Sequence, residues 1–378
     1  MMKRIKMIFL IFLSLVILIS AGVFLFVTFA PQFGAKASGD RLIRIQNSPN
    51  YRNGKFVNPV NTSMRGSGSM LDAMRDYFKG GAGRVPDSEI PVSKVDTSNM
   101  RDESDTDLRI TWLGHSTVLI GIEGNLVLID PMFSHRASPV TFFGVKRFSK
   151  MLPITARDLP EIDAVLISHD HYDHLDYQTI KDIKDKVNRF YVPLGVGSHL
   201  ERWGVQREKI IEHDWWEQSA LNATLTFTAT PARHFSGRGL TDRFGTLWCS
   251  WIIKSEKYSV FFGGDSGYFD GFREIGEKYG PFDITMLESG AYSRYWPSIH
   301  MVPEETVRAH LDLRGEILMP IHWGMFDLSL HTWNEPIKRL TVKAEKENVL
   351  IFTPVVGGSI TIPGPVPVSK WWSFEHDQ

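Results

Sequence analysis

The segment 168–176 concentrates more chemically active side chains than any other part of the chain. It reads Ser-His-Asp-His-Tyr-Asp-His-Leu-Asp, so three histidines and three carboxylates fall within nine residues. It follows the short apolar run 164–167, which predicts a buried strand with the cluster in the loop at its end. Charges and lone pairs crowded in this way repel one another unless a cation neutralises them. We therefore predict a metal site in this loop.

The spacing within the loop indicates two metal ions rather than one. In an extended segment His169 and His171 point to the same side, so both imidazoles reach one ion. Asp173 and His174 lie past the turn, where they can serve a second ion. Two structural alternatives compete with this interpretation. In the first, the segment is a surface loop that is rich in histidine by chance. In the second, it is the start of a helix capped by Asp173 or Asp176.

Three more polar residues follow apolar strand patterns later in the chain. His234 comes after the alternating run 225–229, Asp265 after 260–262 and His322 after 318–321. A lone histidine after a strand is more often a hydrogen-bonded core or rim residue than a ligand. Strand ends at one edge of a layered fold converge, however, so the three residues together complete the first cluster. Nitrogen and oxygen ligands suit zinc and also accept iron or manganese.

The elements that must position these residues form a mixed α/β pattern. Alternating runs at 108–113, 117–122 and 125–129 predict antiparallel hairpins, and the third run ends in Asp130. Asp130 is either a ligand or a carboxylate that braces the metal loop. Further strands are predicted at 191–193, 209–212, 221–230, 247–253, 259–263, 284–287, 317–320 and 349–352, with helices at 70–77, 180–187, 198–203, 303–311 and 336–345. Two sheets with helices outside them account for this order.

The amino-terminal segment predicts a membrane anchor. Residues 7–30 are almost all apolar and carry no charge, and Lys3, Arg4 and Lys6 precede them. That length spans a bilayer, whereas the apolar part of a cleavable signal is shorter. A small-x-small site at 35–37 keeps cleavage open as an alternative. We expect a single-pass helix that holds the main domain at the membrane, outside the cytoplasm.

The predicted organisation has four parts. Residues 1–30 form a basic tip and the anchor, 31–107 a polar stalk or wrapping arm, 108–362 the main domain and 363–378 a tail. With 378 residues, 43% of them hydrophobic, the chain is long enough for one large core. Its net charge of -1 provides no excess of Lys and Arg for a phosphate backbone, which argues against nucleic-acid binding. Flat apolar sandwich surfaces would allow a homodimer, although no residue pattern requires one.

Several motifs resemble the metallo-β-lactamase superfamily. They are Thr-Trp-Leu-Gly-His at 111–115, the loop 169–174, His234, Gly-Asp at 264–265 and Ile-His-Trp-Gly at 321–324. Within that superfamily, the segments 130–139 and 212–217, and His300 followed by Pro-Glu-Glu at 303–305, most resemble one group of phospholipases D. That group hydrolyses N-acylphosphatidylethanolamine. The similarity extends from about residue 108 to residue 336.

The resemblance implies an αβ/βα four-layer sandwich behind the transmembrane helix, with two zinc ions per chain. It assigns the metal ligands as His169, His171 and His234 on the first ion, Asp173, His174 and His322 on the second, and Asp265 between them. It also assigns catalytic roles to Asp173, Asp265 and His300, substrate contacts to Tyr292, Trp296 and His300, and support of the ligands to His115 and Asp130. The implied reaction is phospholipase D-type hydrolysis of N-acylphosphatidylethanolamine or a related phospholipid by water activated between the metals.

Two other functions remain open at this point. A lactonase or other ester hydrolase needs the same activated water, so the ligands do not separate it from a phosphodiesterase. A non-catalytic metal-binding scaffold of the envelope is the second alternative, although a scaffold would be expected to lose ligands. Glu288, just before Gly290, also departs from the phospholipase pattern. If it faced the substrate it would repel an anionic phosphate.

Overall fold

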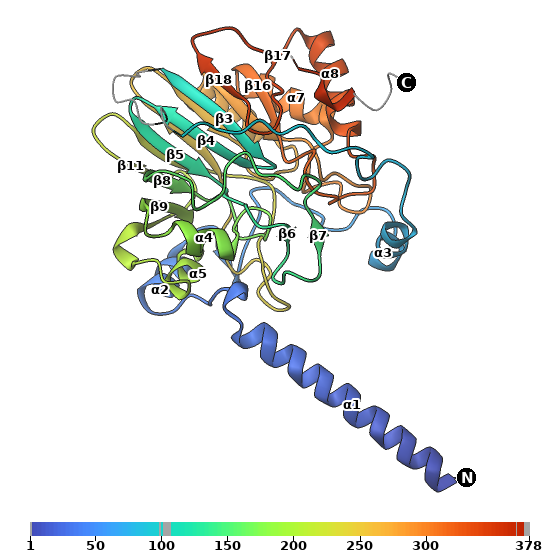
Figure 1. The fold of residues 1–378 in the computed structure, drawn as a ribbon. Helices are drawn as coiled ribbons and strands as arrows, with labels where there is room; N and C mark the ends of the chain where they lie inside the picture. The colour runs from blue at the N-terminus through green and yellow to red at the C-terminus, as the bar shows by residue number, and fades with distance from the viewer. Residues whose placement is uncertain (1, 98–99, 101–106, 368, 374–378) are drawn as a thin grey trace.

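The computed structural model describes residues 2–97, 100, 107–367 and 369–373. Within these residues two mixed sheets face each other with helices on their outer sides, so the predicted αβ/βα sandwich is confirmed (Figure 1). Residue 1 of the predicted tip, residues 98–99 and 101–106 of the predicted arm, and residues 368 and 374–378 of the predicted tail lie outside the described residues.

Each of the two large sheets has seven strands. The first contains β3 (Leu108–Gly114), β4 (Thr117–Ile122), β5 (Asn125–Ile129), β8 (Ile162–Leu166), β9 (Val187–Pro193), β10 (Ile210–His213) and β18 (Ser359–Ile362), in the order β10-β9-β8-β5-β4-β3-β18. The second contains β11 (Gln218–Ala220), β12 (Thr226–Thr230), β13 (Ser250–Lys254), β14 (Ser259–Phe262), β15 (Phe282–Glu288), β16 (Gly315–Ile321) and β17 (Leu350–Ile351), in sequence order. Two small ribbons pair β1 (Tyr51–Arg52) with β2 (Lys55–Phe56), and β6 (Arg136–Ala137) with β7 (Val145–Lys146).

Helices cover the outer face of each large sheet. On the first sheet these are α4 (Tyr177–Ile183) and α5 (Gly197–Arg202), and on the second α7 (Pro303–Asp312) and α8 (Glu335–Glu347) (Figure 1). Helix α6 (Gly271–Tyr279) packs into the same core as α7. Along β4, Val118 and Ile120 pack into the core between the sheets, whereas Leu119 packs into the separate core that contains residues of α4 and α5. Because neighbouring strand residues point to opposite faces, one apolar strand contributes to both cores.

The sheet topology brings the polar loops to one edge. Strands β5 and β8 are parallel, and so are β14, β15 and β16. Strand β12 runs in the same direction as β14, because β13 is antiparallel to both. The loops that follow these strands carry Asp130, the segment 168–176, His234, Asp265 and His322. The metal centre can therefore form only where the edges of the two sheets meet.

The amino-terminal part leaves the domain as one long helix, α1 (Met2–Phe29), with no buried residue (Figure 1). In the described part of the chain it is the single helix long and apolar enough to cross a membrane. Its length and composition fit an anchor and a signal sequence alike. Beyond it, α2 (Gly39–Asn47) packs on the domain, where Arg41 forms ion pairs with Glu212 at 2.5 Å and Glu201 at 3.1 Å. The next helix is α3 (Met70–Lys79).

Several local predictions were wrong for identifiable reasons. The predicted strand at 221–230 begins only at Thr226, because the Asn222 side chain accepts hydrogen bonds from the backbone of Thr224 and Leu225 and forms a turn. The predicted strand at 247–253 begins at Ser250, because Cys249 donates instead to the carbonyl of Ser168 in the metal loop. Val187 belongs to β9 rather than to a helix. Helices α2 and α6 and strand β18 were not predicted.

Candidate metal centre

Three histidines converge at one side of the centre. His169 and His171 come from the loop after β8, and His234 from the loop after β12. His169 Nε2 lies 2.8 Å from His171 Nδ1, which in turn lies 3.3 Å from His234 Nε2. One nitrogen from each ring falls within 4.8 Å of the other two. Their nitrogen lone pairs can therefore serve one ion.

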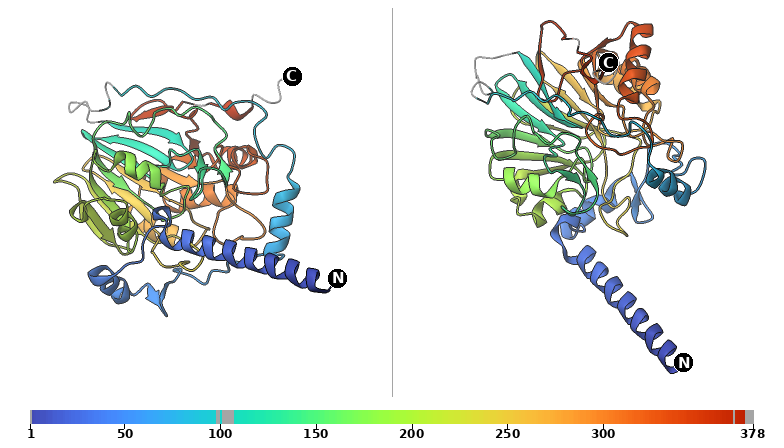
Figure 2. Two further views of the ribbon diagram at one scale, coloured as in Figure 1. Left: turned by 60° about the horizontal axis from the view of Figure 1, so that its bottom comes forward. Right: turned by 45° about the vertical axis from the view of Figure 1, so that its right-hand side comes forward.

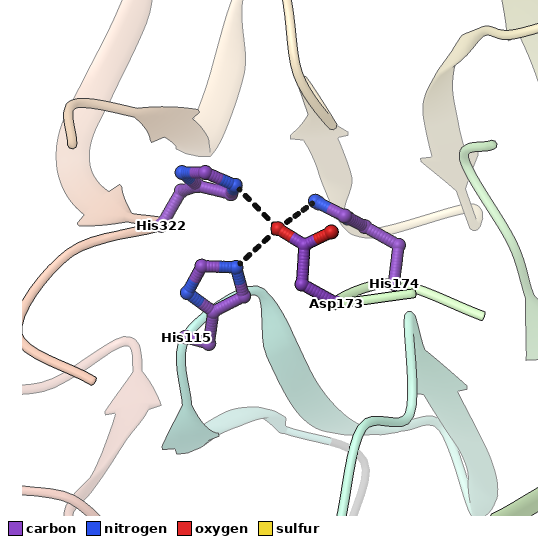
Figure 3. Close-up of side chains that lie close together, drawn as sticks. All are labelled: His115, Asp173, His174 and His322. Carbon is purple, nitrogen blue, oxygen red and sulfur yellow. Dashed lines mark hydrogen bonds and ion pairs between the residues drawn. The ribbon is translucent and has the colours of Figure 1, made fainter. Parts of the chain in front are cut away.

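A second group surrounds Asp173 (Figure 3). Oδ2 of Asp173 lies 3.1 Å from His115 Nε2, 3.2 Å from His322 Nε2 and 3.6 Å from His174 Nε2. These residues come from the loops after β3, β8 and β16, so both sheets contribute. Such a set of one carboxylate and several imidazoles matches the ligands that zinc accepts.

Asp265 lies between the two groups. Its Oδ1 is 3.3 Å from His174 Nε2, and its Oδ2 is 3.1 Å from His322 Nε2. The same Oδ2 lies 3.9 Å from His169 Nε2 and 3.8 Å from His234 Nε2. One carboxylate therefore reaches toward both groups, which is the arrangement that a bridging ligand needs.

The carboxylates of the loop have separate tasks that sequence spacing did not distinguish. Asp173 points into the centre (Figure 3), whereas Asp170 accepts from the Gly237 backbone at 2.7 Å and from Thr246 Oγ1 at 2.9 Å. Asp176 is the N-cap of α4 and accepts from Thr179 Oγ1 at 2.5 Å. The alternative of a helix cap is thus correct for Asp176, while Asp173 belongs to the second group.

Asp130 stands directly behind His174. Its Oδ2 lies 2.7 Å from His174 Nδ1, and its Oδ1 accepts from the Ser168 backbone at 2.7 Å. His234 is held in a similar way, with Nδ1 2.9 Å from the carbonyl of Ile299. A hydrogen bond donated by Nδ1 fixes the tautomer of the ring and leaves the lone pair of Nε2 free to bind a metal ion. The geometry favours the bracing alternative for Asp130 over direct ligation.

The backbone around the centre is held in an unusual conformation. His115, Asp130 and His322 have φ angles of 53°, 42° and 61°, in the left-handed region that side chains with a Cβ rarely adopt. Such conformations persist only where surrounding contacts enforce them, and they cluster at functional sites. His115, to which the resemblance assigns support of the ligands, lies within the second group, 3.1 Å from Asp173 Oδ2.

The electrostatics differ between the two sides of the centre. Burial lowers the pKa of His169 and of His234 well below the ordinary histidine value, so both present neutral imidazoles. Burial acts in the same direction on His322, but Asp265 and Asp173 outweigh it and raise its pKa to about 10. Neutral imidazoles and ionised carboxylates are the forms in which these side chains bind metal.

The centre also contains buried polar atoms without a hydrogen bond. In the described residues, His174 Nε2 and Asp265 Oδ1 lie 3.3 Å apart, yet neither makes a hydrogen bond although both are buried. Buried polar atoms are nearly always paired, so each such atom requires an explanation. Metal cations between these donors would satisfy both, and the donor set of imidazole nitrogen and carboxylate oxygen fits them. The residues are consistent with a di-metal site.

His300 lies beside the centre and is backed by Glu288. Its ring centroid is 5.0 Å from that of His234 and 5.6 Å from that of His322. Glu288 is fully buried, accepts from the Met301 backbone at 2.7 Å and places Oε1 3.3 Å from His300 Nδ1. Its carboxylate therefore stands behind His300 rather than facing an open pocket.

The two aromatic residues predicted as substrate contacts have partners within the protein. Tyr292 donates its hydroxyl hydrogen to Glu335 at 2.8 Å, and its ring stacks on His331 with centroids 4.3 Å apart. Trp296 donates through Nε1 to the carbonyl of Ala291 at 2.6 Å. Their role toward substrate stays a prediction.

Sequence reasoning missed two residues that support the loop. Arg238 donates to the carbonyls of Asp170 and Leu175, and His199 Nε2 lies 3.3 Å from Asp170 Oδ2. Neither residue belongs to a motif or follows a strand pattern, so no local signal was available to find them.

Comparison with known proteins identifies the class. Residues 125–323 match the family model of the beta-lactamase superfamily domain. Igni18, a metallo hydrolase of Ignicoccus hospitalis, superimposes with a TM-score of 0.52 at 21% identity, covering 69% of this chain and all of its own, and so shares the fold. The matched domain and the histidine and aspartate centre define a metal-dependent hydrolase. The chain belongs to the metallo-β-lactamase superfamily.

Two relatives extend the similarity beyond the core domain. An uncharacterized protein of Mycobacterium tuberculosis is 42% identical over 345 residues, which cover 90% of this chain and 91% of that protein. N-acyl-phosphatidylethanolamine-hydrolyzing phospholipase D 1 of Caenorhabditis elegans is 37% identical over 257 residues, which cover 65% of this chain and 71% of that enzyme.

Proposed function

We propose that the protein hydrolyses the phosphodiester bond of N-acylphosphatidylethanolamine or a related phospholipid. The observation that carries the proposal is the pair of ligand groups joined by Asp265, because paired metal sites are typical of enzymes that displace an alcohol from phosphorus. The named activity of the Caenorhabditis elegans relative supports the choice of substrate.

The metal centre would have two zinc ions. His169, His171 and His234 would hold one, Asp173, His174 and His322 the other, and Asp265 would contact both. When bound, the ions would lower the pKa of a water molecule and neutralise charge on a phosphoryl oxygen. His115, 3.1 Å from Asp173, would fix the orientation of that carboxylate.

The chain's own contribution to the chemistry would come from His300. With Nδ1 facing Glu288 at 3.3 Å, its other ring nitrogen, Nε2, is the atom that can donate a proton to the oxygen of the leaving alcohol. The Glu288 carboxylate would keep the ring in that orientation and stabilise it while Nε2 carries the proton. The expected repulsion of a phosphate by Glu288 would be offset by the positive charge of a protonated His300, whose Nδ1 lies 3.3 Å from the carboxylate.

The predicted location supports the same substrate class. As a single-pass anchor, α1 would hold the domain at a bilayer, outside the cytoplasm, and raise the local concentration of a lipid substrate. Phospholipid would then be the main partner of the active site, and the membrane the partner of α1.

Hydrolysis of a substrate panel tests the proposal. The full-length, metal-loaded protein is incubated with N-acylphosphatidylethanolamine, phosphatidylcholine, bis-p-nitrophenyl phosphate and simple lactones. The His169→Ala variant removes one ligand, and His135→Ala, an exposed histidine outside the centre, is the matched control.

We expect phosphatidic acid to be released from the N-acylated lipid by the wild type and the control, and not by His169→Ala. Turnover of lactones alone would reject the phospholipid substrate and favour an ester hydrolase on the same centre. Absence of turnover on every substrate, with metal bound, would reject catalysis in favour of a scaffold.

A further inference from the structure

Helix α3 presents its apolar side away from the domain. Met70, Leu71, Met74 and Phe78 recur at helical spacing along one side, and Leu71 and Phe78 are each 76% exposed. A surface helix of a globular protein normally buries such a stripe against the core. Of its ten residues only Ala73 is buried. The stripe therefore needs an apolar partner from outside this domain.

The polar side of α3 is the side that attaches it to the domain. Asp76 Oδ2 accepts from Tyr295 Oη at 2.6 Å and from Arg294 Nη2 at 2.9 Å. The Arg84 guanidinium lies 4.3 Å from the ring centre of Tyr77 and also donates to the Tyr77 carbonyl at 2.9 Å. These contacts hold the helix with its apolar side outward, so the exposure of the stripe follows from specific bonds.

The direction of α1 relative to the domain is also set by specific bonds. Arg202 donates to the carbonyl of Phe29 at 2.6 Å, and Trp203 Nε1 donates to the carbonyl of Pro31 at 2.6 Å. Phe26, near the end of α1, lines a cavity of about 410 Å³ together with Phe142, at the tip of the β6–β7 hairpin. If α1 spans a membrane, the bilayer surface must pass close to this end of the helix.

Other exposed apolar side chains lie in loops of the same region. Phe142 is 82% exposed and Phe143 is 73% exposed, and both belong to the hairpin tip that shares the cavity with α1. In all three views α3 lies at the edge of the domain on the side toward which α1 runs (Figures 1 and 2). A plane that contains the end of α1 can therefore include both α3 and the hairpin tip.

We propose that α3 and the tip of the β6–β7 hairpin insert into the lipid bilayer surface from which α1 emerges. Met70, Leu71, Met74 and Phe78 would lie among the acyl chains at the interface, and Phe142 and Phe143 would form a second point of insertion. An amphipathic helix at the interface binds in this way by burying its apolar side. The domain would then be held at three places in one orientation, rather than hanging from a single helix.

Site-specific fluorescence in vesicles tests this inference, which rests on α1 spanning the membrane and not on the identity of the substrate. The one native cysteine, Cys249, is buried, so a single cysteine can be introduced and labelled with an environment-sensitive dye in the full-length protein. The test variants are Phe78→Cys and Phe142→Cys. Val342→Cys, on the exposed side of α8, is the water-exposed control, and Leu18→Cys in α1 is the membrane control.

The protein is reconstituted in phosphatidylcholine and phosphatidylglycerol vesicles with and without lipids that carry a spin-label quencher at a shallow or at a deep position of the acyl chain. We expect at least twofold quenching at positions 78 and 142 by the shallow label and at position 18 by the deep label, and none at 342. Quenching at position 18 but not at 78 would overturn the inference while keeping the anchor. Quenching at none of the four labelled positions would overturn both the inference and the anchor.

A second copy of this chain is the other apolar partner that could cover α3. Pyrene at position 78 distinguishes this case, because contact between two copies produces excimer emission that grows with protein density in the vesicle. Excimer emission without quenching by spin-labelled lipid would overturn the bilayer contact and identify α3 as a dimer surface. Lipid quenching without excimer emission supports the bilayer.

Discussion

Arg238 joins the segment after the amino-terminal helix to the metal loop: its Nη2 donates to the carbonyl of Gln32 at 2.9 Å, and its Nη1 donates to the carbonyl of Asp170 at 2.6 Å. His199 repeats the connection, since its Nδ1 accepts from the Ala35 backbone and its Nε2 lies 3.3 Å from Asp170 Oδ2. The segment after the helix is therefore a structural support of the metal loop, and cleavage at 35–37 would separate Gln32 and Ala35 from α2 and from the domain.

Replacing Arg238 should destabilise the loop. In Arg238→Met the carbonyls of Gln32, Asp170 and Leu175 lose their common donor while most of the side-chain volume remains. We expect a loss of about 3 kcal/mol in the free energy of unfolding, from buried acceptors left unpaired. Chemical denaturation of wild type and variant in the same detergent measures this free energy. Arg243→Met is the control, because Arg243 stacks over Phe235 on the same loop. Equal stability of the two variants would contradict the support role.

Metal removal should abolish activity and leave a recoverable protein. We expect about two metal ions per wild-type chain by elemental analysis, and about one in His171→Ala and in Asp173→Ala, since each removes a ligand of a different group. Dialysis against a chelator should eliminate turnover, and added zinc should restore it. A wild type that never binds more than one ion would contradict the two-metal arrangement.

Asp130→Asn should weaken metal binding without removing a ligand. The amide cannot replace the carboxylate that faces His174 Nδ1 at 2.7 Å, so the imidazole becomes less basic and less well oriented. Loss of such a supporting partner typically reduces metal affinity about 10- to 100-fold. Competition with a chelating dye measures the affinity. Asp176→Asn, a carboxylate of the same loop that caps α4, should leave it unchanged, and a similar loss there would show that the effect is not specific.

Glu288→Gln should lower kcat by a factor that depends on the leaving group of the substrate. If Glu288 acts by orienting His300, the variant should lose about tenfold or more in kcat on an alkyl phosphodiester, which needs a proton donor. It should change little on bis-p-nitrophenyl phosphate, whose leaving group needs none. The loss should also be absent in a His300→Ala background. Glu305→Gln, at the start of α7, is the control, and equal losses on both substrates would indicate a merely structural effect.

His310 should make stability depend on pH. It is buried under the second sheet, 2.7 Å from Thr285 Oγ1, and burial lowers its pKa to about 4, against 6.5 when exposed. Between these values the unfolded chain binds more protons, so stability rises with pH and falls on acidification from pH 7 toward 4. At pH 5 this one histidine lowers the free energy of unfolding by about 2 kcal/mol relative to its value above pH 7. Denaturation midpoints of His310→Gln should fall less steeply over this range than those of the wild type, and parallel curves would contradict the assignment.

The sequence alone was sufficient for most strands of the two large sheets and for most of the residues that meet at the centre. Strand periodicity is local, so β4 and β5 were predicted with their observed bounds. The loop 168–176 is equally local, because the spacing of His169 and His171 along one extended segment already brings both rings to one side. His234, Asp265 and His322 were found because polar residues at the ends of strands in one layered fold meet at a common edge.

Only the tertiary structure decided which carboxylate does what. Asp170, Asp173 and Asp176 are alike in the sequence, yet their roles differ because each contacts different parts of the structure. Asp170 braces a neighbouring loop, Asp173 points into the centre, and Asp176 caps helix α4. The burial of Glu288 behind His300 depends in the same way on the packing of distant segments. So do the bonds of Arg238 to the carbonyl of Gln32 and the outward apolar side of α3. Periodicity determines where a strand ends, but the contacts made across long sequence separations determine where a side chain points.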